Sequence, residues 1–424
     1  MKKRNSDGIP PKVWRILETV SRLADERGIA AYAVGGFVRD LLLKRPLVDV
    51  DITVLGDGIS FAQALASAVK GRSDAFTRFG TAIVVVPGFG KVDVTSARSE
   101  TYERPGALPT VGSGDILQDL ARRDFTINSM AFDLSPHRFL DLIDPYGGVR
   151  DLKNGLVRVH HEGSFLDDPT RIFRAVRFEQ RFGKRLEAET ERLLREALQK
   201  GCFDTVSGER LRNELILIFA EPHPEKAVVR LHEIGVLKVI HPRLGLRSGD
   251  AAILTQVPWA LGLFDRSGKP LDERWMIWFQ ALLGGLREME AEALSGRLLL
   301  SRNERKIVLQ RATAARGVRA RLSGEKLPFS RIHELLAPLV NEVQCFVASS
   351  LRPGPRKRVE AYYRRVTSMK PFLRGKDLQK LGVPPGFQYS FLLQKAFAFQ
   401  LDGEFRTKKH ALKWARGTHA RQKK

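Results

Sequence analysis

The stretch Val48-Asp49-Val50-Asp51-Ile52-Thr53-Val54 says most about the fold of this chain. Apolar residues occupy every second position, a pattern typical of a half-buried β-strand. Asp49 and Asp51 then share the other face, with Cα atoms roughly 6–7 Å apart. Two carboxylates that close raise each other's pKa unless a cation lies between them, and Mg²⁺ suits such a pair together with substrate phosphates. A solvated strand face is the alternative.

A diglycine lies upstream, between a predicted strand at Ala31–Val34 and a predicted helix that begins at Phe37. Glycines at such a turn let backbone N–H groups approach a ligand closely, and a helix N-terminus favours an anion. Arg39, one turn into the helix, can donate two hydrogen bonds to phosphate oxygens. Binding a nucleoside triphosphate with a metal and transferring its nucleotidyl group needs a phosphate-binding turn, a cationic side chain and paired carboxylates. The sequence supplies them in Gly35, Gly36 and Arg39 with Asp49 and Asp51.

The composition indicates a folded, strongly basic protein. The 424 residues suffice for two to four domains, and 71 Lys and Arg face 48 acids, a net charge of +23. A surplus that large favours a polyanionic partner, usually nucleic acid. No apolar run is long enough to span a membrane, and the basic start leads into no signal core, so we expect no membrane association. Cys202 and Cys345 are far apart, which predicts buried thiols in a reducing cytoplasm.

The first part of the chain predicts a small α/β domain ending near residue 150. Apolar residues from Val13 to Ala24 recur at helical spacing. Further strands are expected at Thr81–Val86 and Lys91–Ser96, with a helix at Ser60–Val69 before them.

The rest of the chain predicts helices, with linkers at Gly245–Asp250 and Arg352–Arg356. The expected helices are Glu187–Gln199, Glu209–Ala220, Pro224–His232, Glu273–Leu283, Glu288–Leu294 and Asn303–Arg316. The last stretch, Phe405–Lys424, has eight basic residues and no acid. It is either a frayed tail or an extension that contacts RNA.

Two further segments add polar groups. Asp93 alternates with Val92 and Val94, so it is a candidate third carboxylate beside the first two, or a solvent-facing residue. Arg98 and Glu100 follow and are expected to form an ion pair. On a helix, Asp124 and Asn128 would lie one turn apart and suit ribose hydroxyls, although Asp124 could simply be a helix N-cap.

A row of arginines follows Asp168-Pro169, which itself is typical of a helix start. Arg171, Arg174 and Arg177 share one helical face, opposite an apolar stripe. An Asp acceptor beside an Arg donor could recognise the hydrogen-bonding edge of a base. A structural salt bridge is the rival interpretation.

These segments resemble, in order, the motifs of the class II tRNA nucleotidyltransferases. The matching stretches are Gly35-Gly36-Phe37-Val38-Arg39-Asp40, Asp49-Val50-Asp51, Arg122-Arg123-Asp124-Phe125-Thr126-Ile127-Asn128 and Asp168-Pro169-Thr170-Arg171 with Arg174-Ala175-Val176-Arg177-Phe178. The family includes CCA-, CC- and A-adding enzymes and bacterial poly(A) polymerases. The likeness runs from about Ala31 to Glu214 and is general beyond it.

The resemblance implies an α+β fold: a polymerase-β-like palm with a small mixed sheet, then all-α domains. The implied bounds are 1–150 for the palm, 151–222 for the neck, 223–350 for the body and 351–424 for the basic tail.

It also implies a reaction and its residues. The enzyme would add nucleotides to the 3′ end of tRNA from CTP or ATP, with two Mg²⁺ ions, in the cytoplasm. Asp49 and Asp51 would carry the metals, with Asp93 as a further catalytic acid. Gly35, Gly36 and Arg39 would hold the triphosphate, Asp124 and Asn128 would contact the ribose, and Asp168 and Arg171 would select the base. Arg123, Arg174 and Arg177 would complete the nucleotide site, and Glu209 and Arg210 would brace it.

Two departures bear on base choice. The base-selecting motif usually begins Glu-Asp, but here it begins Asp167-Asp168. The segment Tyr102–Val111 looks more like that of A-adding relatives. A poly(A) polymerase and a non-catalytic RNA-binding protein on the same fold are the alternatives.

Overall fold

The computed structural model describes residues 8–47, 49–76, 80–101, 103, 106, 110–324 and 326–422. Val48, most of the Tyr102–Val111 segment and the last two lysines lie outside the described residues. The chain divides into two compact units, the first Met1–Glu214 with Glu221–His223, the second Leu215–Ala220 with Pro224–Lys424.

The first unit is built on a mixed sheet, as expected. Its order is β3-β4-β5-β2-β1-β8-β9, with β2 and β5 parallel and the other pairs antiparallel. The strands are β1 (Ala31–Val34), β2 (Val50–Val54), β3 (Arg72–Phe76), β4 (Thr81–Val86), β5 (Gly90–Ser96), β8 (Ala131–Asp133) and β9 (Asp141–Ile143). Two further strands, β6 (Arg98–Thr101) and β7 (Thr110–Ser113), form a separate antiparallel ribbon.

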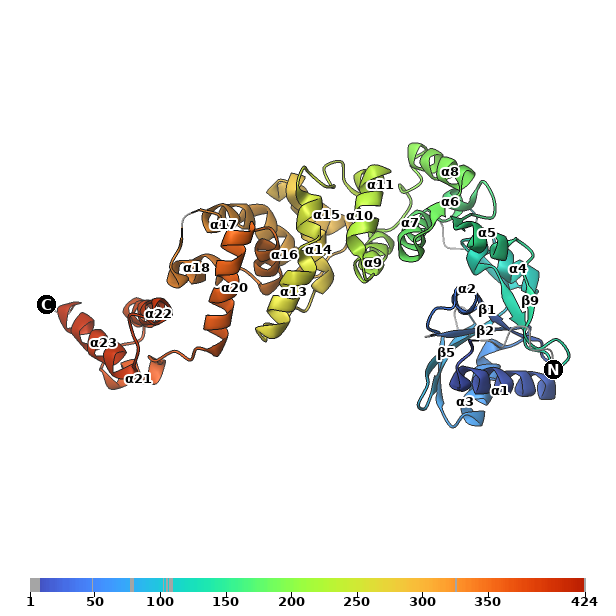
Figure 1. Cartoon of the computed structure of the whole chain (residues 1–424), viewed down its shortest axis with the longest axis horizontal. Helices are drawn as coiled ribbons and strands as arrows, with labels where there is room; N and C mark the ends of the chain where they lie inside the picture. Colours follow the sequence, from blue (N-terminus) through green and yellow to red (C-terminus); the bar gives the residue numbers. More distant parts are fainter. Residues whose placement is uncertain are drawn as a thin grey trace. The chain divides into compact units, whose positions relative to one another are not determined.

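Hydrophobic alternation fixes β2 at the centre of this sheet. Val50, Ile52 and Val54 are completely buried. The helices α1 (Pro11–Arg27) and α3 (Gly58–Ala68) cover one face of the sheet (Figure 1). The solvated-face alternative for β2 is wrong, because Thr53 on the opposite face is also buried and its Oγ1 lies 3.2 Å from Thr95 Oγ1.

Short helices connect the sheet to the rest of the first unit. They are α2 (Gly36–Leu42), α4 (Ile116–Ala121), the 3-10 turn η2 (Thr126–Asn128), α5 (Gly148–Asn154), α6 (Ser164–Asp167), α7 (Arg171–Phe182) and α8 (Ala188–Gln199), with the two-residue strands β10 (Leu156–Val157) and β11 (Arg185–Leu186). The helix α9 (Gly208–Phe219) begins in the first unit and ends in the second. Ile172, Ala175 and Val176 of α7 are completely buried, which confirms the predicted apolar stripe and leaves the arginines on the other face.

The second unit is helical throughout its described residues. Its helices are α10 (Pro224–Glu233), α11 (Val236–Ile240), α12 (Asp250–Leu254), α13 (Val257–Arg266), α14 (Arg274–Leu282), η3 (Leu283–Gly285), α15 (Glu288–Arg297), α16 (Arg302–Thr313), α17 (Ala315–Leu322), α18 (Phe329–Leu336), α19 (Asn341–Ser349), α20 (Pro353–Ser368), α21 (Gly375–Lys380), α22 (Phe387–Asp402) and α23 (Lys408–Gln422). None of the described helices is long and apolar enough to cross a bilayer.

Two expectations for this unit need correction. Residues 353–356 are the first turn of α20 and not a linker, because Pro353 occupies a first-turn position where its missing N–H costs nothing. The frayed-tail alternative for the basic C-terminal stretch is wrong within the described residues, because Lys408–Gln422 forms α23, whose Ala411 and Ala415 pack in a hydrophobic cluster with Leu392. Both cysteines are free and buried, as predicted.

Candidate active site

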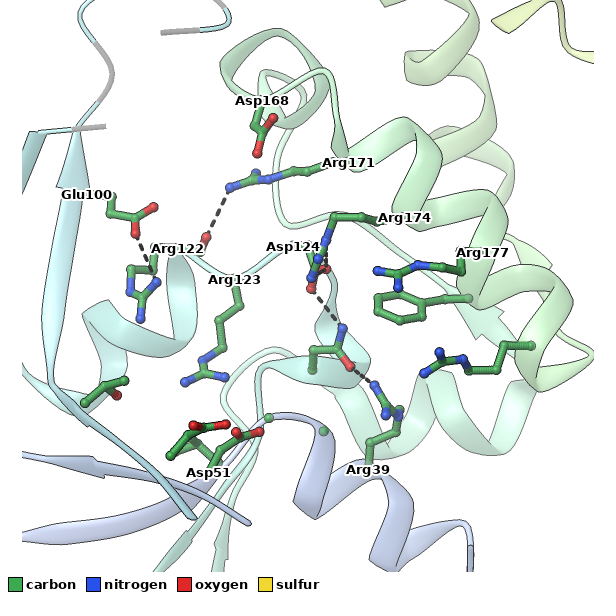
Figure 2. Close-up of a pocket in the computed structure, with 18 of the residues that line it drawn as sticks. Arg39, Asp51, Glu100, Arg122, Arg123, Asp124, Asp168, Arg171, Arg174 and Arg177 are labelled. Carbon is green, nitrogen blue, oxygen red and sulfur yellow. Dashed lines mark hydrogen bonds and ion pairs between the residues drawn. The ribbon is translucent and has the colours of Figure 1, made fainter. Parts of the chain in front are cut away.

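A cavity of about 540 Å³ in the first unit is lined by most of the predicted site residues. It collects Gly35, Gly36, Arg39, Asp51, Asp93, Arg123, Asp124, Asn128, Asp168, Arg171, Arg174 and Arg177 (Figure 2). Asp49 is the predicted residue that does not line it. Sequence reasoning overlooked Glu100, Arg122, Phe178 and Arg181 as lining residues. Extending the arginine row of α7 by one more turn would have found Arg181.

Neighbouring strands bring two carboxylates together on one edge of the cavity. Asp51 of β2 and Asp93 of β5 are direct partners in the parallel register, so their side chains project from the same face. Burial, with repulsion from Asp93 and Asp49, raises the pKa of Asp51 to about 6, although Arg123 opposes the rise. Burial and Asp49 also raise the pKa of Asp93. Burial therefore disfavours the ionised form of both carboxyls, and the neighbouring carboxylates add to this effect.

Asp49 itself is exposed and precedes β2, so it lies at the rim of this acidic edge. Among the residues that the structure describes, no three His, Cys, Asp or Glu side chains converge closely enough to form a ready-made metal cluster. Mg²⁺ does not need one, because it is commonly bound by one or two carboxylates completed by water and substrate phosphates. The Asp51 and Asp93 carboxylates fit that requirement.

The diglycine turn lies beside Asp51, and its first residue, Gly35, has no room for a side chain while Arg123 keeps its position. Gly35 has φ +68° and ψ −127°, a conformation that a side chain strongly disfavours. A Cβ there would lie 2.5 Å from Nη1 of Arg123 and 3.7 Å from Oδ2 of Asp51. The absence of a side chain thus keeps open the space between the turn, Arg123 and Asp51.

A buried carboxylate fixes Arg123 in this position. Asp119, completely buried, accepts hydrogen bonds from Arg123 Nη2 (2.8 Å) and Arg122 Nη2 (2.6 Å). Burial alone would raise the pKa of Asp119, but the two arginines hold it below its ordinary value. Glu100 pairs with Arg122 (3.0 Å) and with Arg98 (3.1 Å), which confirms the ion pair expected of Arg98 and Glu100.

A chain of hydrogen bonds crosses the other side of the cavity. Arg39 Nη1 donates to Asn128 Oδ1 (2.5 Å), Asn128 Nδ2 donates to Asp124 Oδ1 (2.9 Å), and Arg174 Nη2 donates to Asp124 Oδ2 (2.5 Å). Asp124 and Asn128 are therefore together, as predicted. The predicted helix is wrong, however, since only residues 126–128 form a 3-10 turn.

These hydrogen bonds determine the charge state of Asp124 and the availability of Arg39. Burial would raise the pKa of Asp124, but Arg174 and Asn128 hold it below its ordinary value, so this carboxylate is an ionised acceptor. Arg39 Nε and Nη2 already donate hydrogen bonds to Asp40, at 3.0 and 2.9 Å, so this side of the guanidinium is not available for a bidentate contact with a phosphate. Its Nη1 donates to Asn128, and the side chain still lines the cavity, so its contact with the triphosphate stays a prediction.

The rival interpretation, a salt bridge between Asp168 and Arg171, is wrong, because each side chain has another partner. Asp168 Oδ1 accepts from Arg210 Nη2 (2.6 Å) and from Thr170 Oγ1 (2.6 Å), whereas Arg171 Nη2 donates to the carbonyl of Arg122 (3.1 Å). Both side chains still line the cavity. Asp168 is also not the N-cap of α7, which begins at Arg171, because the Asp-Pro-Thr segment forms a turn of its own.

Arg210 joins this turn to a distant loop. Besides Asp168, its Nη1 donates to the carbonyl of Gly106 (3.2 Å), and Gly106 N donates to Leu166 O (3.0 Å). The expectation that Arg210 braces the site is consistent with these bonds, whereas Glu209 is exposed.

Comparison with known proteins identifies the family. Residues 31–158 match the family model described as Poly A polymerase head domain, and residues 185–245 match one described as a probable RNA and SrmB-binding site of polymerase A. The chain is 33% identical over 409 residues to the A-adding tRNA nucleotidyltransferase of Halalkalibacterium halodurans, covering 95% of this chain and 92% of that protein. The chain belongs to the tRNA nucleotidyltransferase and poly(A) polymerase family.

Other members are similar over different lengths. The A-adding tRNA nucleotidyltransferase of Geobacter sulfurreducens is 38% identical over 94% of this chain, but this chain spans only 46% of that protein. A solved structure of a Thermotoga maritima CCA-adding enzyme complexed with tRNA is 31% identical, covers 97% of both chains and has a TM-score of 0.81. The family thus carries both the sheet unit and the helical unit.

Proposed function

We propose that this nucleotidyltransferase adds nucleotides to the 3′ end of tRNA, and that its reaction is the addition of the terminal A. The observation that carries the proposal is the cavity in which an acidic edge, a diglycine turn and seven arginines meet. A triphosphate is the ligand class that needs carboxylates for a metal and cations for its oxygens in one site.

In this reaction the 3′-oxygen of the RNA forms a bond to the α-phosphorus of ATP, the bond from that phosphorus to the β-phosphate oxygen breaks, and pyrophosphate leaves. Asp51 and Asp93 on the cavity edge, with Asp49 at its rim, would hold Mg²⁺, which would acidify the attacking hydroxyl and neutralise the leaving group. The diglycine turn and Arg123 would bind the triphosphate oxygens. Arg174 and Arg177 would add positive charge on the opposite side.

Asp124 and Asn128 are proposed to hold the ribose, because a buried, ionised carboxylate accepts hydroxyl hydrogens well. Asp168 and Arg171 are proposed to recognise the base from separate anchor points, Asp168 through Arg210 and Arg171 through the carbonyl of Arg122. Since each is fixed independently, their donors and acceptors can face the base without pairing with each other.

Relatives support the choice of A. Two A-adding proteins match over 94% and 95% of this chain, and a third, of Aquifex aeolicus, is 44% identical over 46% of it, whereas the CCA-adding enzyme of Lactobacillus helveticus is 36% identical over 51%. The Thermotoga CCA-adding enzyme also matches throughout, at 31% identity, against 38% for the Geobacter protein and 33% for the Halalkalibacterium protein. We also propose a cytoplasmic location, in keeping with the two free, buried cysteines.

The test offers tRNA transcripts that end before the CCA, after its first C or after its second C, each with CTP or ATP alone. Addition of one A, only to the transcript ending in the second C, is expected. Incorporation of C would overturn A-only addition, and a long A tail would favour a poly(A) polymerase. Asp51→Asn should abolish incorporation and leave tRNA binding intact, while Asp74→Asn, on the exposed edge strand β3, is the matched control.

A further inference from the structure

A second, smaller cavity lies in the helical unit and is lined by arginines. It has a volume of about 200 Å³, and Arg247, Arg311, Arg316 and Arg319 border it together with Asp250 and Gly284. Arg311 lies in the last turn of α16, Arg316 and Arg319 project from α17, and Arg247 comes from the loop before α12. Nothing in the reaction proposed above uses these residues.

The positive charge of this cavity is poorly offset. Within the described part of the chain, none of the four arginines forms an ion pair, and Asp250 is the lone carboxylate on the wall. One oxygen of Asp250 already accepts the backbone N–H of Arg247 at 2.8 Å. Four guanidinium groups around one carboxylate repel one another, so an anion between them would be stabilised.

Arg311 is held rigidly with its donors available. Its Nε donates to the carbonyl of Gln280 (3.1 Å), and its guanidinium lies over the ring of Phe346, 4.7 Å from the centroid. Burial, followed by the neighbouring arginines, lowers the pKa of Arg311 to about 10, although Asp250 opposes the change. Its two terminal nitrogens have no protein acceptor among the described residues, which leaves them for a ligand.

Space for the ligand comes from Gly284. A Cβ at this position would make ordinary contacts with Asp250 Oδ2 (3.4 Å) and Arg311 Nη2 (3.6 Å), so a longer side chain would take up part of the space between them. The cavity is smaller than typical pockets for drug-sized molecules, which suits a single tetrahedral oxyanion better than a nucleotide. Arginine forks match the geometry of phosphate oxygens.

We propose that this cavity binds one phosphate group, and that the phosphate belongs to the backbone of the RNA substrate. The second clause rests on the proposed function. A chain with a net charge of +23 binds RNA largely through phosphate contacts, and here the structure assigns one such contact to a preformed pocket. Free inorganic phosphate has the same chemistry and is the alternative source.

The test compares Arg319→Ala and Arg247→Ala with Arg321→Ala, an exposed arginine of α17 that does not line the cavity. All three side chains are exposed, so loss of folding is not expected. The full chain is titrated with inorganic phosphate and followed by ³¹P NMR line width, with the candidate active site occupied by a non-hydrolysable ATP analogue. Binding of tRNA is measured separately over a series of KCl concentrations.

Both cavity variants should lose phosphate binding, and their affinity for tRNA should fall roughly tenfold. The slope of log affinity against log salt concentration should decrease by about one, and kcat at saturating tRNA should be unchanged. Arg321→Ala should change neither the phosphate titration nor kcat, and should lower the salt slope by less. Loss of phosphate binding with an unchanged tRNA slope would overturn the RNA source. Variants that match the control in both measurements would overturn the site. Neither binding measurement needs turnover, so a failure of the proposed function remains distinguishable.

Discussion

Replacement of Asp51 by Asn should stabilise the metal-free protein while it removes activity. Asp51 is mostly covered, faces Asp93 in the register and has a pKa raised from 3.8 to about 6. Since a tenfold change in an equilibrium is about 1.4 kcal/mol, ionising this carboxyl at neutral pH costs the folded state up to about 3 kcal/mol. An amide of the same shape avoids most of that cost.

The sign follows from the direction of the pKa change. A carboxyl whose pKa is raised in the folded state favours folding fully below about pH 4, where it is protonated in both states, and this contribution is lost as the pH rises through about 6. Asp51→Asn should therefore raise the free energy of unfolding by about 2–3 kcal/mol at pH 8 and change it little at pH 4. Added Mg²⁺ should stabilise the wild type more than the variant and narrow the difference.

The assay is urea denaturation in chelator at both pH values, followed by hydrogen exchange of peptides that cover β1 and β2. Local exchange is needed because the two compact units can unfold in separate transitions. Asp74→Asn on the exposed strand β3 is the control and should leave stability unchanged. A variant no more stable than the wild type at pH 8, or equally stabilised at pH 4, would refute this electrostatic account.

Three further substitutions test the arrangement of the cavity. Gly35→Ala should lower kcat/KM for ATP at least about tenfold, because the new Cβ collides with Arg123; Gly28→Ala, with a similar φ and nothing within 4 Å, should not. Arg210→Gln removes a charged hydrogen bond to Asp168, a kind of bond typically worth about 1.5–3 kcal/mol. The preference for ATP over CTP, measured by single-nucleotide incorporation, should therefore fall roughly tenfold. The control Arg195→Gln, on the surface of α8, should leave this preference unchanged. Asp124→Asn removes the carboxylate partner of Arg174 and should cost about 3 kcal/mol at pH 7. Because the pKa of Asp124 is depressed in the folded state, the loss should shrink as the pH falls from the ordinary carboxyl pKa through that lower value. A loss in urea denaturation that stays the same at every acidic pH where the protein is folded would contradict it.

Local patterns were enough to predict much of the first unit. Backbone geometry sets the period of two in the alternation at residues 48–54 and the period of 3.6 in the arginine row of α7. The diglycine before a helix indicates a turn, because glycine tolerates backbone conformations that other residues avoid. These patterns predicted β2, the turn and the polar face that line the cavity. They missed β3, a largely exposed edge strand, and β8, which has only three residues, because neither is long or regular enough to carry a period.

Tertiary structure decided the partners. Asp51 meets Asp93 because β2 and β5 are parallel neighbours. The two strands are far apart in the sequence: Thr53 and Thr95, the next pair on the same face, are 42 positions apart. Asp168 pairs with Arg210 and not with the nearby Arg171, and four arginines scattered between residues 247 and 319 border one cavity. Sequence periodicity fixes which face a side chain occupies, but only packing decides which distant charge lies opposite it.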